Sequence, residues 1–456
     1  MPLIEDQFED TLLIAPRDVP AVLVMAVQGG WKLPNVRTAV HHPADVGPTR
    51  LAIRDQMRLE TVVLGCRRVD VAGGIVRRLL ELELLDGLSD RSALSWVHAG
   101  HLTHLVFVDP SHASILDDWF RKTARPPDTP DGRDWTVPGW WAHATSWITQ
   151  QVSVGGFGRT RAVEQIRAWE FSCVLRVETD QEDLYFKALP RSYAREPLLV
   201  HHLAQWEPAS VPEVVATNEH ERWLLMRACR GRVLESGAPL TAWERVAGAY
   251  AKLQVASTAH VATLRALGCR ERGPLELRAL IGPLVADQSA LLRGTEHGLT
   301  AEEMSHLRQL LPSLEAACDE LAQSGLPHAL EHGDLWSSNV YVGGDRVAFI
   351  DWTDASLSHP FFSLTPLLLS ASWDPHLSTV PDAQQRIADR YLEHWTAYAA
   401  PDRLRRALAL ARPLAAMHIA VTYWRDIPGP HRQWWMERTV PFFVRIALDA
   451  WGATRG

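Results

Sequence analysis

One stretch in the last third of the chain combines residue types that could transfer a phosphoryl group. Residues 330–354 contain the carboxylates Asp334 and Asp351 together with the amide Asn339. Two apolar segments around the Gly343-Gly344 pair predict a β-hairpin with Asp351 at its far end, which would bring the three side chains near one point. Phosphoryl transfer from ATP needs a carboxylate that orients the attacking hydroxyl, and oxygen ligands that hold Mg2+ against the phosphates. These three residues supply that set.

The spacing His332-x-Asp334-x4-Asn339, followed by Ile350-Asp351-Trp352, is similar to the catalytic loop and metal-binding aspartate of the aminoglycoside phosphotransferase and choline kinase-like family. Members of that family share the two-lobe fold of protein kinases, and the resemblance covers residues 135–456. It implies that Asp334 is the catalytic base and that Asn339 and Asp351 are the Mg2+ ligands. His332 would be structural, with its ring hydrogen-bonded to hold the loop.

A phosphate-contacting lysine is expected on a strand upstream of this loop. Lysine is rare in this arginine-preferring chain, occurring only at positions 32, 122, 187 and 252. Segments 173–177 and 184–188 predict a β-hairpin, and Lys187 on its second strand offers a compact ammonium to the α/β-phosphates. The resemblance implies an acid on the next helix that pairs with this lysine. Glu196 is the nearest candidate, because the Pro197 that follows it is tolerated in a first helical turn.

The turn before that hairpin would lie over the phosphates. It reads Trp169-Glu-Phe-Ser-Cys-Val and lacks the GxGxxG pattern of protein kinases, so cradling of phosphate by glycine backbone is not supported. Ser172 is the candidate phosphate contact in this turn. Residues 223–231 resemble the strand and hinge between the lobes, whose backbone would contact the adenine.

The surrounding pattern predicts an α+β protein with a β-rich first lobe and a helical second lobe, preceded by a separate mixed α/β domain. The Trp-rich segment 135–147 is compatible with an amphipathic helix whose tryptophans are core residues. Five segments have the length and spacing of helices: 243–264, 301–324, 383–399, 402–425 and 433–451.

The acceptor pocket of the resembled family lies between the catalytic loop and the C-terminal helices. Here the chain offers Trp336, Trp373, His418, Tyr423, Trp424, Arg425, Trp434 and Trp435. Their helical spacing makes core packing the first interpretation, although such residues could hold a sugar, a cationic amine or a flat ring. Asp354 is either a further metal contact or the cap of a helix that begins near His359.

The first 125 residues form the added α/β domain, and a Pro- and Asp-rich linker at 126–134 separates it from the predicted lobes at 135–230 and 231–456. Segments 21–26 and 104–108 look like buried strands, whereas the type of 75–86 stays open. The sequence Gly30-Trp31-Lys32-Leu33-Pro34 and the segments after it resemble a degenerate Nudix domain, in which the paired metal-binding glutamates are reduced to Glu60. That resemblance implies the fold without the hydrolase chemistry, and an unrelated α/β cap is the rival. Such a domain could bind ligand, shape the acceptor pocket or mediate homodimerisation.

Composition excludes several classes of protein. The chain has 456 residues with 46 Lys+Arg against 54 Asp+Glu, giving a net charge of -8 without a basic run, so nucleic acid is not an expected partner. Five widely spaced cysteines without a CxxC pair fit a reducing cytoplasm better than a disulfide framework. The acidic N-terminal segment is unlike a signal peptide, and no apolar run reaches the ~20 residues of a membrane span.

These observations predict a cytoplasmic kinase that uses ATP and Mg2+ to phosphorylate a hydroxyl of a small molecule. Aminoglycosides, sugars, amino alcohols and hydroxy amino acids all remain open as acceptors. One alternative is a weak or inactive kinase-like module that senses nucleotide, with the specific function in the first domain. A Nudix-type hydrolase is a second alternative, and the incomplete carboxylate set argues against it.

Overall fold

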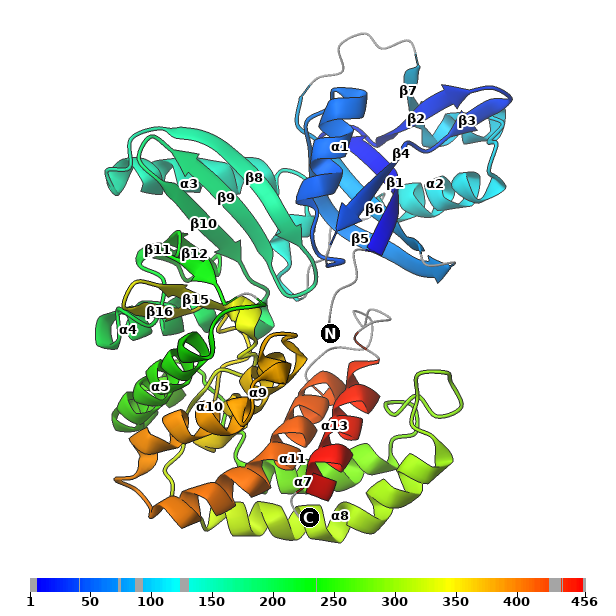
Figure 1. The fold of residues 1–456 in the computed structure, drawn as a ribbon. Coiled ribbons are helices and arrows are strands. Elements are labelled where there is room, and N and C mark those ends of the chain that lie inside the picture. The colour runs from blue at the N-terminus through cyan, green and yellow to red at the C-terminus, as the bar shows by residue number, and fades with distance from the viewer. Residues whose placement is uncertain are drawn as a thin grey trace. The chain divides into compact units, whose positions relative to one another are not determined.

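The structure of the chain is a computed structural model that describes residues 6–40, 42–72, 75–86, 93–123, 131–234, 236–425, 436 and 438–453. The chain divides into two compact units (Figure 1). The first comprises Met1–Ala194 and Val215–Ala228, and the second comprises Arg195–Val214 and Cys229–Gly456. The first unit therefore contains both the predicted added domain and most of the predicted β-rich lobe.

The N-terminal part of the first unit is built from two sheets and two helices. One sheet has the strand order β4 (Asn35–Val40), β1 (Asp6–Pro16), β6 (Ile75–Leu84) and β5 (Thr61–Ala72), and the other has β3 (Gly30–Lys32), β2 (Ala21–Val27) and β7 (Leu94–His98). Strands β1 and β6 are parallel, whereas every other neighbouring pair in these two sheets is antiparallel. The helices are α1 (Gly47–Met57) and α2 (Pro110–Thr123). The mixed α/β character predicted for this region is thus observed.

One predicted strand of this region is wrong. Residues 21–26 lie in β2, and 75–84 form β6, but 104–108 contain only an isolated bridge between Phe107 and Trp31. Val106 and Val108 are 70% and 56% exposed. The apolar residues of this segment resemble a buried strand in sequence, although only Phe107 is buried in the core and Leu105 packs against it partly buried.

A five-stranded antiparallel sheet comes next in the chain. Its order is β11 (Val214–Asn218), β12 (Trp223–Arg227), β10 (Asp183–Ala188), β9 (Cys173–Thr179) and β8 (Thr160–Ala168). The predicted hairpin is confirmed as β9 and β10, which pair from Glu178 opposite Asp183 to Cys173 opposite Ala188. Strand β8 is an edge strand of this sheet.

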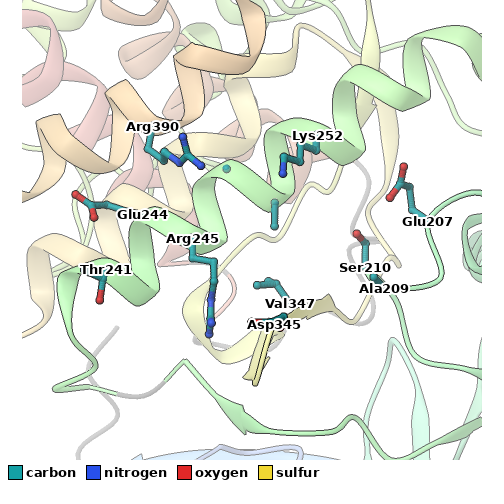
Figure 2. A pocket seen from close by; sticks show the side chains of 12 residues that line it. Glu207, Ala209, Ser210, Thr241, Glu244, Arg245, Lys252, Asp345, Val347 and Arg390 are labelled. Atoms are coloured by element: carbon teal, nitrogen blue, oxygen red, sulfur yellow. The ribbon is translucent and has the colours of Figure 1, made fainter.

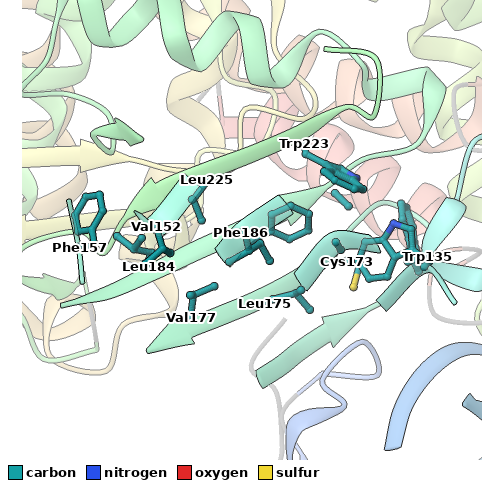
Figure 3. Close-up of a cluster of buried hydrophobic side chains, with 14 residues drawn as sticks. Trp135, Val152, Phe157, Cys173, Leu175, Val177, Leu184, Phe186, Trp223 and Leu225 are labelled. Atoms are coloured by element: carbon teal, nitrogen blue, oxygen red, sulfur yellow. The ribbon is translucent and has the colours of Figure 1, made fainter. Parts of the chain in front are cut away.

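Helix α3 (Trp140–Val154) packs against one face of this sheet, as the Trp-rich segment predicted. Alternate residues of β9 and β10, including Leu175 and Phe186, share a buried cluster with Trp140 of the helix and Trp135 before it (Figure 3). Because successive side chains of a strand point to opposite faces, Lys187 lies on the face away from this cluster.

The second unit is mainly helical. Its helices are α4 (Glu196–Trp206), α5 (Leu240–Ser257), α6 (Val261–Ala266), α7 (Pro274–Ala286), α8 (Ala301–Ala322), α9 (Leu364–Trp373), α10 (Ala383–Leu392), α11 (Pro401–Arg425) and α13 (Thr439–Ala453). Three predicted helices differ in extent. The segment 243–264 is interrupted by a 3-10 turn at Thr258–His260, 383–399 leaves the α-helix at Leu392, and the last helix begins at Thr439. Residues 433–435 of that last prediction lie outside the described residues.

Two small sheets surround the predicted catalytic segment. One contains β13 (Arg232–Val233), β15 (Val340–Gly343) and β16 (Arg346–Phe349), and the other pairs β14 (Ala329–Glu331) with β17 (Ser356–Ser358). Gly343 pairs with Arg346, so the two-residue turn is Gly344-Asp345, one residue later than predicted. Gly344 has φ +52°, a conformation that favours glycine. The β14–β17 pair fixes the start of the loop that carries Asp334 beside the segment that follows Asp351.

The composition led us to expect cysteines outside a disulfide framework and no membrane-spanning segment. All five cysteines are free thiols. Among the helices in the described ranges, none combines the length and the apolar character that a bilayer crossing requires.

Candidate active site

Asp334 and Asn339 are joined by hydrogen bonds within one loop. The Asn339 Nδ2 donates to the Asp334 backbone oxygen at 2.9 Å and to its carboxylate Oδ2 at 2.8 Å. The 3-10 turn Ser337–Asn339 makes this reach possible, because it folds Asn339 back toward the start of the loop. The amide nitrogen is thereby directed at Asp334, and the Asn339 side-chain oxygen is its remaining ligand atom.

His332 is completely buried and links this loop to the residue that follows β16. Its Nε2 lies 3.0 Å from the Ile350 backbone oxygen, and its Nδ1 lies 3.3 Å from the Asp334 amide nitrogen. An Nδ1 that accepts implies a proton on Nε2, which then donates to Ile350. The ring also packs against Trp352, with 4.4 Å between centroids. His332 therefore links the residue before Asp351 to the backbone of Asp334.

Asp351 occupies an unusual backbone conformation. Its φ of +65° is left-handed, a region that costs a non-glycine residue about 1–2 kcal/mol. The Thr353 hydroxyl lies 2.5 Å from the Asp351 Oδ1 and 2.8 Å from the Glu196 Oε2. Glu196 also accepts a hydrogen bond from the Trp352 amide at 3.2 Å. The loop that carries Asp351 is thus fastened to the first residue of α4.

Arg195, which precedes Glu196, strengthens this attachment. Its guanidinium donates to the backbone oxygens of Thr353 at 2.6 Å and Ala355 at 3.3 Å. The sequence pattern did not identify Arg195 or Thr353. The only signal for Thr353 is its position two residues after Asp351, and Arg195 has no signal except its neighbour Glu196.

Gly333 lets the loop of Asp334 approach the loop of Asp351. Its φ is +81°, and a Cβ at this position would meet the Asp354 backbone oxygen at 2.6 Å. Asp354 is therefore part of this contact. The prediction that Asp354 caps the following helix is wrong, because the 3-10 turn Pro360–Ser363 is capped by the His359 side chain and Ser363 precedes α9.

The electrostatics of Asp334 follow from this arrangement. Withdrawal of its carboxylate from water raises the pKa of Asp334 to about 7, and the negative charges of Asp351 and Asp354 contribute to this rise. Hydrogen bonds from Asn339 and Trp336 act in the opposite direction. The negative charges of Asp351 and Asp354 therefore disfavour the charged form of Asp334.

This donor set fits a magnesium ion. Within the described ranges, no three His, Cys, Asp or Glu side chains form a ready-made metal cluster. Mg2+ is commonly bound through one or two carboxylates together with phosphate oxygens and water. The carboxylate of Asp351 and the side-chain oxygen of Asn339 match that chemistry, and a cation there would relieve the repulsion that raises the pKa of Asp334.

The residues predicted to contact nucleotide lie in the first unit. Lys187 is the penultimate residue of β10, the central strand of the sheet; it lies opposite Val174 and Leu224 and is 6% exposed. Ser172 is buried in the turn between β8 and β9, and its hydroxyl accepts a hydrogen bond from the Trp169 indole at 3.1 Å. A hydroxyl that accepts retains its own proton to donate. The contacts of both residues with nucleotide remain predictions, as does the pairing of Lys187 with Glu196.

An aromatic cluster extends from the catalytic loop to the C-terminal helices. Trp336 stacks on Trp373, with 5.5 Å between centroids and 14° between ring planes, and Trp373 is 38% exposed. Phe443 and Phe442 of α13 contact these two rings, and Tyr423 stacks on Phe443. Trp424 points elsewhere, with its indole nitrogen 2.9 Å from Asp287. Trp434 and Trp435 lie outside the described residues.

His418 belongs to the core of the second unit. Its ring is buried beside Glu331, 3.2 Å from a carboxylate oxygen, and packs against Phe362. This buried position agrees with core packing, the first interpretation of His418 from the sequence.

One pocket of the second unit is lined by other residues. It has a volume of about 460 Å³ and is lined by charged side chains of both signs, among them Lys252, Arg390 and Glu207 (Figure 2). None of its lining residues belongs to the predicted catalytic or metal set.

The family model of the phosphotransferase enzyme family (APH) matches residues 162–418, which is more than half of the chain. Lys187, Glu196, Asp334, Asn339 and Asp351 all fall within this match. Among curated protein sequences, none matches the chain significantly.

Solved structures of kinases align with about two thirds of the chain. Choline kinase LicA from Streptococcus pneumoniae is 14% identical, with 68% of this chain and 99% of that chain covered and a TM-score of 0.46. A choline/ethanolamine kinase family protein from Mesorhizobium loti is 15% identical, with 68% and 93% covered and a TM-score of 0.43. A spectinomycin phosphotransferase solved with ADP and spectinomycin is 11% identical, with 67% and 98% covered and a TM-score of 0.43.

The extent of the family match agrees with the resemblance read from the His332–Asp351 segment. On that basis the chain belongs to the phosphotransferase enzyme family.

Proposed function

We propose that this protein is an ATP-dependent kinase that transfers the γ-phosphoryl group to a hydroxyl of a small molecule. The observation that supports this most strongly is the direct hydrogen bonding of Asn339 to Asp334, in a loop held against Asp351 and Asp354. The match to a phosphotransferase family over the same residues supports the reaction type.

In this proposal Asp334 accepts a hydrogen bond from the acceptor hydroxyl and orients it for in-line attack on the γ-phosphorus. Asn339 and Asp351 hold Mg2+, which when bound neutralises phosphate charge. The hydrogen bond from Asn339 fixes the orientation of the Asp334 carboxylate, and the His332 contacts fix its backbone. Catalysis then rests on positioning and on charge neutralisation, which are the main contributions in phosphoryl transfer.

Nucleotide contacts are assigned by sequence position. Lys187 would neutralise the α/β-phosphates, Ser172 would donate to a phosphate oxygen, and Glu196 would orient the lysine. The buried position of Lys187 supports the first assignment, because a lysine is rarely enclosed unless an anion or a ligand compensates its charge. Through its hydrogen bonds with Trp352 and Thr353, Glu196 also holds the loop that carries Asp351 in place.

We further propose that residues 1–125 are an added domain joined through 126–134 to lobes at 135–230 and 231–456. The five free thiols fit a reducing cytoplasm. The acceptor class stays open among aminoglycosides, sugars, amino alcohols and hydroxy amino acids. The stacked Trp336 and Trp373 rings near Asp334 in the catalytic loop favour an acceptor with an apolar or cationic face.

A coupled ADP-release assay with Mg-ATP tests the proposal, using a panel of aminoglycosides, hexoses and amino sugars, choline-like amines and homoserine-like acids. The Asp334→Ala variant serves as the blank. We expect one acceptor class to give turnover that the blank lacks. Binding of Mg-ATP without turnover on any acceptor would favour a nucleotide sensor, and near-normal turnover by the variant would overturn the assignment of Asp334.

A further inference from the structure

The N-terminal region, which contains strands β1 to β7, is joined by main-chain contacts to β8, an edge strand of the five-stranded sheet. The Val46 amide donates to the Ile166 oxygen, and the Ala168 amide donates to the Ala44 oxygen, both at 3.1 Å. Asp45 and Arg167 form an antiparallel bridge, and the Arg167 guanidinium donates to the Asp45 carboxylate at 2.9 Å. Residues 44–46 thus pair with β8 through an isolated bridge and two flanking main-chain hydrogen bonds. An edge strand covered in this way has few unpaired main-chain groups along the paired stretch.

This junction includes a buried side-chain contact. Gln165 of β8 is 1% exposed, and its amide both accepts from the Val63 amide and donates to the Val63 oxygen, each at 2.8 Å. Val63 belongs to β5 of the N-terminal sheet. The Gln165 side chain therefore satisfies both the N–H and the C=O of Val63 and links the two sheets. Breaking this link would leave buried polar groups unpaired, at a cost of about 1–3 kcal/mol each.

The same junction coincides with an irregularity in β8. Gln165 pairs with Leu175 of β9, whereas Arg167 pairs with Val174, so Ile166 is an extra residue in the strand. A bulge of this kind bends its strand and changes the direction of the chain beyond it. The oxygen of Ile166 is the group that accepts from Val46. The N-terminal region therefore stabilises the bulge, and three residues later the chain enters the turn at 169–172.

That turn is held by side chains instead of by glycine geometry. The Trp169 amide donates to the Ser172 oxygen, and its indole donates to the Ser172 hydroxyl, both at 3.1 Å. The Trp169 ring contacts Phe171 edge to face, with 4.7 Å between centroids. On the N-terminal side, the His42 ring meets the Trp169 ring edge to face, with 5.1 Å between centroids and 89° between planes. The His42 Nδ1 accepts from the Ala44 amide at 3.0 Å, which fixes the ring on the segment that bridges to β8.

We propose that His42 is a positioning residue for nucleotide binding, and that the N-terminal region acts as a brace that sets the conformation of the 169–172 turn. The inference rests on the proposed function, since it takes this turn to lie over the nucleotide phosphates. A turn without the GxGxxG glycines needs another source of rigidity, and the contacts from residues 42–46 supply it. In this proposal the added N-terminal domain supports nucleotide binding by the β-rich lobe.

The test measures Mg-ATP binding to the full chain by titration calorimetry, so it does not depend on knowing the acceptor. We expect His42→Ala to weaken Mg-ATP binding about three- to tenfold, the range that loss of one aromatic ring contact allows. His42→Phe keeps a ring against Trp169 and is expected to restore most of the affinity. The matched control is His104→Ala, an exposed histidine of the same region, which is expected to leave binding unchanged.

A second measurement separates positioning from general destabilisation. The melting temperature of His42→Ala is expected to stay near that of the wild type. In the ADP-release assay, KM for ATP is expected to rise, whereas KM for the acceptor that gives turnover in the panel is not. Equal affinity of the wild type and His42→Ala, or a loss that appears equally in both KM values, overturns the brace. If the wild type itself does not bind Mg-ATP, the proposed function is overturned together with the brace. If the wild type binds and His42→Ala binds equally well, only the brace is overturned.

Discussion

The carboxylate of Asp334 accepts a hydrogen bond from Asn339 at 2.8 Å, so the proposed base and a proposed metal ligand are direct partners. The residue that orients the acceptor and the residue that holds the cation therefore cannot move independently. A change at either position is expected to affect both functions, although to different extents.

Replacement of Asp334 tests the base. Asp334→Ala is expected to lower kcat by about 10²- to 10⁴-fold, the usual contribution of a positioned proton acceptor, with Mg-ATP binding largely preserved. Steady-state kinetics and calorimetry measure the two quantities. Asp345→Ala, which removes an exposed acid from the adjacent hairpin turn, is the control and should retain activity. A fall in kcat of less than tenfold for Asp334→Ala would contradict the assigned role.

Replacement of Asn339 tests the metal site. Asn339→Ala is expected to raise the Mg2+ concentration needed for half-maximal activity by about tenfold or more, because it removes a ligand and the hydrogen bond that orients Asp334. Chelation by EDTA should abolish turnover in the wild type, and added Mg2+ should restore it. Ser338→Ala, at the neighbouring position, should keep the wild-type Mg2+ dependence. An unchanged dependence in Asn339→Ala would exclude the residue as a ligand.

Gly333 is expected to be intolerant of any side chain. Gly333→Ala places a methyl group 2.6 Å from the Asp354 backbone oxygen and forces alanine to adopt a left-handed φ. We therefore expect the free energy of unfolding to fall by about 2–4 kcal/mol. Gly325→Ala is the matched control, because its φ of +82° is nearly the same and its Cβ would meet no atom within 4 Å. Urea unfolding of both variants separates the steric effect from the backbone effect. Equal losses would show that contact with Asp354 is not what requires glycine.

The buried Glu331 predicts a stability change in acid. Burial pushes the pKa of Glu331 up, but the His418 ring, Arg272 and the Ser356 hydroxyl outweigh it and hold the pKa at about 2, below the usual 4.5. The unfolded chain therefore binds this proton first as the pH falls. The stabilisation is complete above about pH 4.5 and is lost progressively toward pH 2.

Urea unfolding between pH 6 and pH 3 measures this effect. The difference in stability between the wild type and Glu331→Gln should amount to a few kcal/mol at pH 6 and should shrink as the pH falls. Glu320→Gln, which removes an exposed partner of Arg406, should change stability by less than about 1 kcal/mol at every pH. A pH-independent difference for Glu331→Gln would mean that the ion pair with His418 is not responsible.

The aromatic cluster predicts a defect confined to the acceptor. Trp373→Ala removes a partly exposed ring that stacks on Trp336 and is expected to raise KM for the acceptor about 5- to 50-fold while KM for ATP stays constant. Tyr398→Ala is the control, since this tyrosine is 39% exposed and contacts Trp395 instead. If KM for ATP changes as much as KM for the acceptor, the cluster does not form the acceptor surface.

The sequence by itself determined the expected reaction chemistry and most of the elements around it. A hairpin such as β9–β10 is visible because alternation and a polar turn are local properties, and the spacing from His332 to Asp351 is local as well. Residues 104–108 mislead for the same reason, since an apolar pentapeptide does not show whether its neighbours cover it. The Gly344-Asp345 turn is displaced by one residue because two adjacent glycines offer two registers, and only pairing of Gly343 with Arg346 selects one.

Only the tertiary structure decided which distant residues support the site. The contacts of Glu196 with Trp352 and Thr353 join positions more than 150 residues apart, and Gln165 meets Val63 across 102 residues. Such pairs leave no periodic trace, because each depends on how whole elements pack and not on spacing along the chain. For that reason the sequence identified the residues proposed to perform the chemistry, whereas packing alone revealed Arg195, Thr353 and His42 as residues that hold the surrounding loops in place.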